Sequence, residues 1–271
     1  RPNSPKRRQR KVTMPVLDLP TGAQLDYVDV YRGSAAEPPV LLLIHGWLGS
    51  AQADFADLLP WLSARFRVIA PTRRGYGESG PKPRDYPVDF LRRDARDLLA
   101  LLDALHVDRF HILGWSDGGE TGLCAAGLAG DRARSCAVWG ATGYYAPTMH
   151  DAIAKTYPPT WMDTETKARN HLSDADADQL VLRWVQAVRQ ITDQGGDAAL
   201  SLAPQITAPV LMMLGKQDRL NPASSAEQFL SHVADGGLVM FECGHNIHWD
   251  ETGKFKRVLT AFWDHDVQGG R

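Results

Sequence analysis

Short runs of apolar residues recur along this chain, and segments of helical periodicity separate them. Six runs are almost wholly apolar, as expected of strands buried on both faces of a sheet: 40–44, 66–70, 110–113, 136–139, 210–214 and 238–241. Two earlier segments, 12–19 and 24–31, read as strands joined at the Thr21-Gly22 turn. Strands that alternate with helices predict an α/β fold with a mostly parallel, eight-stranded sheet and helices on both faces.

Two helices between these strands have specific signals. Apolar residues spaced by three or four positions put one face of a helix against the core: Leu91, Ala95, Leu98, Leu102 and Leu105. Asn221-Pro222 predicts the start of another helix, with asparagine as the N-cap and proline at the first helical position.

Residues 144–204 interrupt the alternation. They contain no buried-strand pattern, only helix-like stretches such as 179–191. A structureless loop of that length is uncommon inside a compact domain. We therefore expect a helical lid at 144–204, inserted in a core made of 12–143 and 205–271, with a flexible basic tail at 1–11.

Composition narrows the classes of partner. The chain has 271 residues, of which 44% are hydrophobic and 23% charged, a profile typical of a globular protein. A net charge of −2 argues against nucleic acid or an acidic membrane as a general partner. No apolar run approaches the roughly 18 residues of a membrane span. The expected partner is a small molecule, and the oligomeric state is left open.

Cysteine content and the N-terminal segment bear on location. Cys124, Cys136 and Cys243 are too few and too scattered for a disulfide framework or a zinc cluster, which favours a reducing, cytoplasmic location. Residues 1–11 hold six basic residues and no acidic one. If this segment is the remnant of a targeting peptide, the location is mitochondrial instead.

The clearest chemical signal is Gly114-Trp115-Ser116-Asp117-Gly118-Gly119, between a predicted strand and a predicted helix. A nucleophile on a tight strand-to-helix turn needs small residues two positions to either side, so that strand and helix can approach. The bare Gly-x-Ser-x-Gly pattern is common by chance, but its flanks favour Ser116 as a catalytic nucleophile.

A serine nucleophile needs a base, and the base needs an orienting acid. Asp218 follows the strand 210–214, and His245 follows the strand 238–241, so each lies just past a strand end. The alternatives are a helix-capping or surface aspartate at Asp218 and a histidine without a catalytic role at His245. A metal cluster of His245, His248 and Asp250 is disfavoured because His245 serves the serine. We expect no metal and no cofactor.

Acyl transfer also needs donors for the negative charge that develops on the carbonyl oxygen. The backbone N–H of Asp117, at a helix start, supplies one. The turn His45-Gly46-Trp47 follows the strand 40–44 and supplies a second through the Trp47 N–H. His45 itself is interpreted as a structural turn residue rather than a catalyst.

Together, His45-Gly46, the Gly-x-Ser-x-Gly motif, the late aspartate and the late Gly-His resemble the α/β-hydrolase family over nearly all of the chain after Lys11. The segment 74–79 resembles a family turn that an aspartate usually opens two residues before the arginine. Thr72 stands at that position here, a departure that is expected to weaken a structural hydrogen bond. The resemblance implies an α/β-hydrolase fold and a serine hydrolase.

Narrower motifs are similar to the biphenyl hydrolase-like proteins, the valacyclovir hydrolases: Gly-Trp-Ser-Asp-Gly-Gly, Arg84-Asp85-Tyr86-Pro87, Val138-Trp139-Gly140-Ala141, Trp184-Val185 with Arg189-Gln190, and His245-Asn246-Ile247-His248. That resemblance implies hydrolysis of α-amino-acid esters. Asp117 fits it, because a carboxylate beside the nucleophile selects an α-ammonium by charge. The alternative is that Asp117 only caps the helix.

Trp139, Tyr144 and Trp161 are expected to line the acyl pocket, although each is equally compatible with plain core. One triad serves many acyl substrates, so a lactone, thioester or C–C bond hydrolase is an alternative to an ester hydrolase. A ligand receptor of slow turnover on the same scaffold is a third reading.

Overall fold

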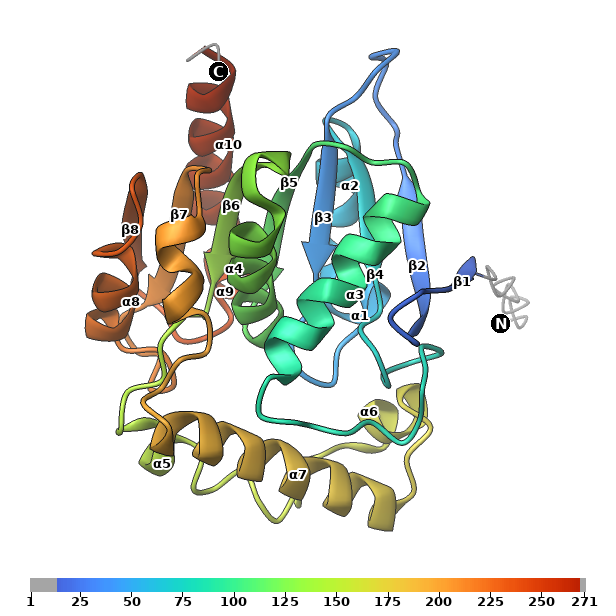
Figure 1. Ribbon diagram of the computed structural model, residues 1–271, viewed down its shortest axis with the longest axis vertical. Coiled ribbons are helices and arrows are strands. Elements are labelled where there is room, and N and C mark those ends of the chain that lie inside the picture. Colours follow the sequence, from blue (N-terminus) through green and yellow to red (C-terminus); the bar gives the residue numbers. More distant parts are fainter. Residues whose placement is uncertain (1–13, 269–271) are drawn as a thin grey trace, which may run out of the picture.

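A sheet of eight strands forms the centre of the computed structural model, which describes residues 14–268 (Figure 1). Its order is β1-β2-β4-β3-β5-β6-β7-β8. The strands are β1 (Val16–Asp18), β2 (Gln24–Val30), β3 (Val40–Ile44), β4 (Arg67–Pro71), β5 (Phe110–Trp115), β6 (Ala133–Trp139), β7 (Val210–Gly215) and β8 (Gly236–Phe241). The predicted tail at 1–11 lies outside the described residues.

Pairing in the sheet is mostly parallel, as the alternation of strands and helices predicts. β1 pairs with β2, and β2 with β4, in antiparallel fashion, and the pairs from β4 through β8 are parallel. Ile44 of β3 pairs with Gly114 of β5, and Trp115 pairs with Trp139 of β6. The carboxyl ends of these strands therefore meet at one edge, where the loops after them lie side by side.

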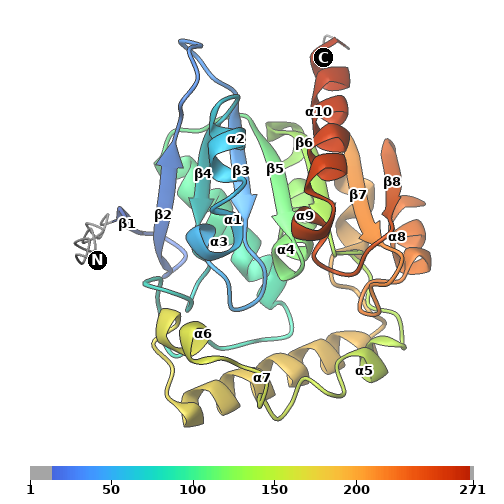
Figure 2. The same cartoon turned by 180° about the vertical axis from the view of Figure 1, so that it is seen from behind.

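Helices cover both faces of the sheet. One face carries α3 (Phe90–Ala104), α4 (Asp117–Ala129) and α8 (Ala223–Leu230), and the other carries α1 (Ala51–Phe55), α2 (Leu59–Ser63), α9 (Ile247–Asp250) and α10 (Thr252–Gln268) (Figures 1 and 2). Two short 3₁₀ helices, η1 (Gly130–Arg132) and η2 (Leu200–Gln205), complete the core. Leu91, Ala95 and Leu98 of α3 are buried against the sheet as their spacing predicts. The α/β fold class is thus confirmed.

Three helices of the segment 144–204, α5 (Met149–Ala152), α6 (Thr164–Arg169) and α7 (Asp174–Asp193), lie across the carboxyl end of the parallel strands (Figures 1 and 2). A capping box of Ser173 and Asp176 starts α7. Its buried residues recur every three or four positions and include Leu180, Trp184 and Val188. This stripe turns toward the strand ends, so α7 supplies a wall there.

Within residues 14–268 no helix combines the length and the apolar character that crossing a membrane requires.

Candidate active site

Ser116 sits on the turn that joins β5 to α4. Its backbone has φ 55° and ψ −127°, a conformation that L-residues rarely adopt. The Ser116 N–H donates to the carbonyl of Trp139 on the neighbouring strand, at 2.9 Å. This strained turn projects the hydroxyl beyond the sheet edge, at the start of a helix.

The glycines on either side of Ser116 are required by close backbone contacts. A Cβ at Gly114 would lie 2.5 Å from the carbonyl oxygen of Gly118. A Cβ at Gly118 would lie 2.2 Å from the carbonyl oxygen of His45. Both distances are well below van der Waals contact. The first contact lets strand and helix approach, and the second sets the start of α4 against the turn after β3.

The structure brings Ser116, Asp218 and His245 together in one hydrogen-bonded chain. His245 Nε2 lies 2.9 Å from Ser116 Oγ, and His245 Nδ1 lies 2.7 Å from Asp218 Oδ2. With the neutral imidazole protonated at Nδ1, Nδ1–H donates to the carboxylate and Nε2 accepts the serine proton. The three side chains come from loops after β5, β7 and β8, so the parallel sheet alone places them side by side.

Two further donors hold the Asp218 carboxylate. The Leu220 N–H donates to Oδ1 at 2.9 Å, and Asn221 Nδ2 donates to Oδ2 at 3.0 Å. Burial alone would raise the pKa of Asp218, but the hydrogen bond and charge of His245, with those two donors, bring the pKa below its usual value. The carboxylate therefore stays ionised beside the imidazole.

Asn221 corrects one prediction. It is not the N-cap of α8, because the helix begins at Ala223 and Pro222 is its N-cap. The Asn221 side chain turns to Asp218 instead and lies in the wall beside Ser116. A helix-start pattern cannot show that contact, since it depends on how the loop after β7 folds back.

Gly140, directly after β6, makes room for the imidazole. Its φ is +61°, and a Cβ there would lie 2.7 Å from His245 Cε1. In the sequence, Gly140 stands out only as part of the motif Val138-Trp139-Gly140-Ala141, and that motif predicts no role for it. A glycine that follows a buried strand next to the nucleophile strand is the signal that would have found it.

The two predicted oxyanion donors lie on adjoining turns. The Asp117 N–H belongs to the first turn of α4, where helix N–H groups have no intrahelical acceptor. Trp47 lies three residues after the end of β3. The carbonyl groups of Ile44 and His45, just before it, lie directly against Gly118 of α4. His45 is fully buried, and its Nδ1–H donates to the Gly46 carbonyl while Nε2 accepts from the Arg73 N–H. Burial and the charge of Arg73 hold the pKa of His45 well below its usual value.

A small pocket, partly open to solvent, lies beside Ser116. The core supplies Ser116, Asp117, Glu120, Gly140, Leu220 and Asn221, and the segment 144–204 supplies Tyr145, Met149, Trp184 and Val188. The lining combines apolar side chains with the carboxyl groups of Asp117 and Glu120.

The aromatic residues that sequence reasoning placed in this pocket lie elsewhere. Trp139 is fully buried on the opposite face of the sheet, packs against Phe255, and donates Nε1–H to His248 Nδ1 at 3.0 Å. Tyr144 is not part of the lining, and its neighbour Tyr145 is. Trp161 is 48% exposed and packs on Trp47 with ring centroids 5.6 Å apart, outside the lining.

Asp117 is the acidic residue next to the nucleophile. The residue is buried, with 5% of its surface exposed. Trp184 of α7 donates Nε1–H to Asp117 Oδ2 at 2.8 Å. The same indole stacks on Trp47, with centroids 4.2 Å apart. Burial raises the pKa of Asp117 above its usual value, against the charge of Arg73 and the bond from Trp184. Asp117 therefore ties the helix α7 to the elbow.

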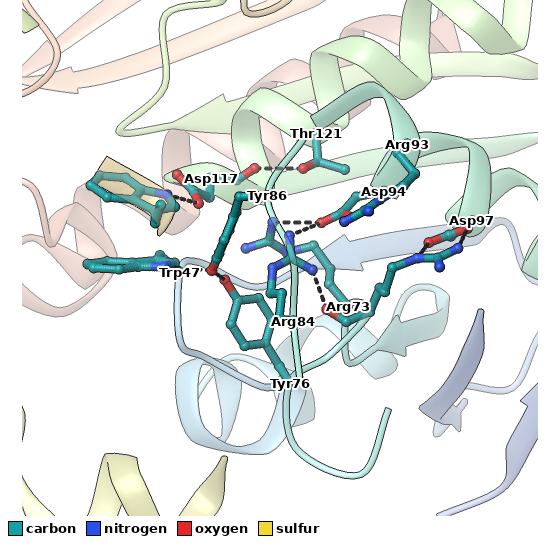
Figure 3. A network of polar contacts seen from close by, with 12 residues as sticks. Trp47, Arg73, Tyr76, Arg84, Tyr86, Arg93, Asp94, Asp97, Asp117 and Thr121 are labelled. Carbon is teal, nitrogen blue, oxygen red and sulfur yellow. Dashed lines mark hydrogen bonds and ion pairs between the residues drawn. The ribbon is translucent and has the colours of Figure 1, made fainter. Parts of the chain in front are cut away.

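Two buried guanidinium groups lie behind Asp117 (Figure 3). Asp94 Oδ2 accepts from Arg84 Nη2 at 2.6 Å and from Arg73 Nη1 at 3.3 Å. The Arg84 guanidinium also lies over the rings of Tyr76 and Tyr86, at 4.4 and 4.7 Å. One carboxylate thus serves two guanidinium groups, which leaves a positive charge near Asp117.

Thr72 shows how the departure from the family turn is accommodated. Its hydroxyl donates to Asp26 Oδ2 at 2.8 Å, and the Ser79 hydroxyl donates to Asp26 Oδ1 at 2.9 Å. Asp26, from β2, therefore supplies a carboxylate to this turn from a neighbouring strand. The turn at Thr72 is thus hydrogen-bonded to a carboxylate from a residue that is distant in sequence.

Among residues 14–268 no group of three or more histidine, cysteine or acidic side chains is arranged to hold a metal ion. His248, a member of the disfavoured cluster, is buried, and burial lowers its pKa to about 4.

Both the sequence and the fold of this chain are similar to those of known hydrolases. A family described as the alpha/beta hydrolase fold matches residues 39–194. The serine hydrolase BPHL of Homo sapiens is 33% identical over 248 residues, which cover 89% of this chain and 83% of that protein. A 2-hydroxy-6-oxononadienedioate/2-hydroxy-6-oxononatrienedioate hydrolase of Paraburkholderia xenovorans is 27% identical over 89% of this chain and 91% of that protein. A crystal structure of a hydrolase from Pseudomonas aeruginosa PA01 has a TM-score of 0.71 at 25% identity, over 94% of this chain and 99% of that one.

Proposed function

The chain belongs to the α/β-hydrolase fold family and is a hydrolase similar to the serine hydrolase BPHL, and on that premise we propose that it cleaves carboxylic esters of α-amino acids. The observation that carries the proposal is the chain of hydrogen bonds from Ser116 Oγ through His245 to Asp218, set on a strained elbow beside a buried carboxylate. The partner in this reading is a small-molecule ester.

In the proposed reaction, Ser116 Oγ attacks the ester carbonyl while His245 Nε2 takes the hydroxyl proton. Asp218 holds the imidazole in the productive tautomer and stabilises the imidazolium. The N–H groups of Asp117 and Trp47 receive the oxyanion. His245 then protonates the departing alcohol, which leaves an acyl-enzyme. Water activated by His245 attacks this ester, and the amino acid is released.

Selectivity for an α-amino acyl group rests on Asp117. Trp184 occupies its Oδ2, and the other oxygen, Oδ1, is the one we assign to the substrate ammonium. An α-ammonium stands one carbon from the scissile carbonyl, so a carboxylate adjacent to the nucleophile is within its range. A partly desolvated carboxylate attracts a cation more strongly than one in water does.

We propose that the segment 144–204 acts as a lid that shapes the acyl side of the pocket. Tyr145, Met149, Trp184 and Val188 come from this segment and line the pocket. Replacement of these side chains would change the shape offered to the acyl group without touching the reacting atoms.

A C–C bond hydrolase is the second candidate, favoured by the relative from Paraburkholderia xenovorans. Its name specifies a dioate, a substrate with two carboxylates. The pocket here is walled by Asp117 and Glu120, which would repel an anionic acyl group. Charge therefore favours the amino-acid ester over that alternative.

The test is Ser116→Ala in the purified protein, assayed on an α-amino ester and its des-amino analogue. Loss of the nucleophile should lower kcat by about 10³-fold or more, with the melting temperature retained. Near-normal kcat in this variant would refute the assignment of Ser116. In the wild-type protein, a burst of alcohol release without steady-state turnover would identify a slow receptor instead of an enzyme.

A further inference from the structure

Glu120 is a buried carboxylate in the pocket wall that the proposed reaction does not use. It is 2% exposed and lines the same pocket as Ser116 and Asp117. It follows Asp117 by three positions on α4, so the two side chains lie on one face of the helix. Two acidic side chains thus face one small pocket from a single helical turn.

The hydrogen bonds of Glu120 fit its ionised form. Oε1 accepts the Thr142 N–H and Oε2 accepts the Gly143 N–H, both at 2.8 Å. An ionised carboxylate is an acceptor at both oxygens, whereas a protonated one must donate from one of them. Two backbone donors aimed at two oxygens therefore stabilise the anion.

No cationic side chain in the described part of the chain forms an ion pair with that anion. None of the ion pairs among residues 14–268 includes Glu120. The titratable groups that face it are Asp117 and Cys124 from α4 and Tyr145 from the segment after β6, and none of these is a cation. A buried charge is costly unless it is paired, so this position favours a positively charged ligand.

The situation of Asp117 is different. Arg73 and Arg84 both lower its pKa by their charge, and Asp94 neutralises only one of these two guanidinium groups. Arg93 lies 4.0 Å from Asp94 but has Asp85 as its own partner at 2.7 Å, so the charges of Arg73, Arg84, Asp94 and Asp117 sum to zero (Figure 3). The surplus negative charge of the pocket wall is therefore that of Glu120.

We propose that Glu120 binds a second cation of the substrate, so that the acyl group is an α-amino acid with a basic side chain, such as ornithine or lysine. This inference rests on the proposed function, in which Asp117 binds the α-ammonium. Side chains three positions apart on a helix have Cβ atoms about 5–6 Å apart. Two carboxylates at that spacing match two ammonium groups on one short acyl chain.

Three esters of one alcohol separate the two carboxylates. Norleucine is lysine without the side-chain ammonium, and hexanoate is norleucine without the α-ammonium. The ratio of kcat/KM for the lysine ester to that for the norleucine ester reports on Glu120. The ratio for the norleucine ester to that for the hexanoate ester reports on Asp117.

Glu120→Gln should lower the lysine-to-norleucine ratio by about ten-fold or more and leave the norleucine-to-hexanoate ratio unchanged. Glu227→Gln, on the exposed side of α8, is the matched control and should change neither ratio. An unchanged lysine-to-norleucine ratio in Glu120→Gln overturns the inference and leaves the proposed function standing. A norleucine-to-hexanoate ratio near one in the wild-type protein overturns the proposed function instead.

The wild-type protein supplies a second readout if Glu120→Gln does not fold. Burial raises the pKa of Glu120 to about 7, against the donors of Thr142 and Gly143. The anion therefore forms as the pH rises through that value, and the lysine-to-norleucine ratio should rise with it. The ionisation of His245 and of the α-amine cancels in this ratio. A ratio that stays flat from about pH 5.5 to 8.5 overturns the inference.

Discussion

Replacement of Asp117 by asparagine removes a charge from the pocket and almost nothing else. The amide has the same size, and its oxygen still accepts the Trp184 Nε1–H that now binds Oδ2 at 2.8 Å. The backbone N–H at position 117 is retained, so the proposed oxyanion donor is unchanged. The variant therefore isolates the attraction between this carboxylate and a substrate ammonium.

The size of that attraction follows from the surroundings of Asp117. A charge-assisted hydrogen bond in a partly desolvated site contributes about 1.5–3 kcal/mol, or about 10- to 150-fold in kcat/KM. Arg73 and Arg84 already face this carboxylate and offset part of its field. We therefore expect the lower half of that range, about 10- to 40-fold, for a norleucine ester. The hexanoate ester should be hydrolysed at nearly the wild-type rate.

The assay compares kcat/KM for the two esters in wild-type protein, Asp117→Asn and the control Trp184→Phe. The control removes the indole donor to Asp117 but keeps an aromatic ring against Trp47. It keeps the carboxyl group, although loss of the donor raises the pKa of Asp117 further, so the preference for the norleucine ester should fall less than in Asp117→Asn. In the wild-type protein the preference should also fall as pH rises above the pKa of the substrate amine, because the neutral amine loses its charge.

Equal losses on both esters in Asp117→Asn would refute this reasoning. Such a result would show that Asp117 shapes the elbow through its contact with α7, with no role in recognising charge. Melting temperatures of the variants separate that case from simple unfolding, because a folded variant with equal losses has a displaced Ser116.

Two further predictions concern the imidazole. Asp218→Asn should lower kcat by about 10³- to 10⁴-fold while the protein stays folded, because an amide favours the wrong tautomer of His245; steady-state rates near those of the wild type would move the orienting acid elsewhere. Gly140→Ala should lower kcat at least about ten-fold and the free energy of unfolding by about 1 kcal/mol, since its Cβ would stand 2.7 Å from His245 Cε1 at a positive φ. Rates and chemical denaturation measure the two effects, and an unaltered kcat would show that Gly140 does not position the ring.

Local patterns in the sequence were sufficient to predict the fold class and the positions of Ser116, Asp218 and His245 along the chain. Apolar runs marked the buried strands, and Gly114 and Gly118 marked the turn that carries Ser116. Asp218 and His245 each followed an apolar run by a few residues. Because the carboxyl ends of parallel strands meet at one edge, positions just after such runs converge without further information. The structure places all three side chains at that edge, with His245 within hydrogen-bond distance of both Ser116 and Asp218.

The identity of the pocket residues depended on features that no local pattern contains. Successive residues of a strand point to opposite faces, so a composition argument could not say that Trp139 belongs to the α10 side. Tyr145 rather than Tyr144 lines the pocket for a similar reason, since adjacent side chains in an irregular segment point in different directions.

Contacts between distant parts of the chain decided the rest. Asn221 turns to Asp218, Gly140 admits His245, and Asp26 replaces an acid at the turn of Thr72. The surplus charge of Glu120 appears only when Arg73, Arg84 and Asp94 are seen on the far side of Asp117. Hydrogen bonds and charge compensation act between atoms a few ångströms apart, whatever their separation along the chain, so only the folded arrangement determines them.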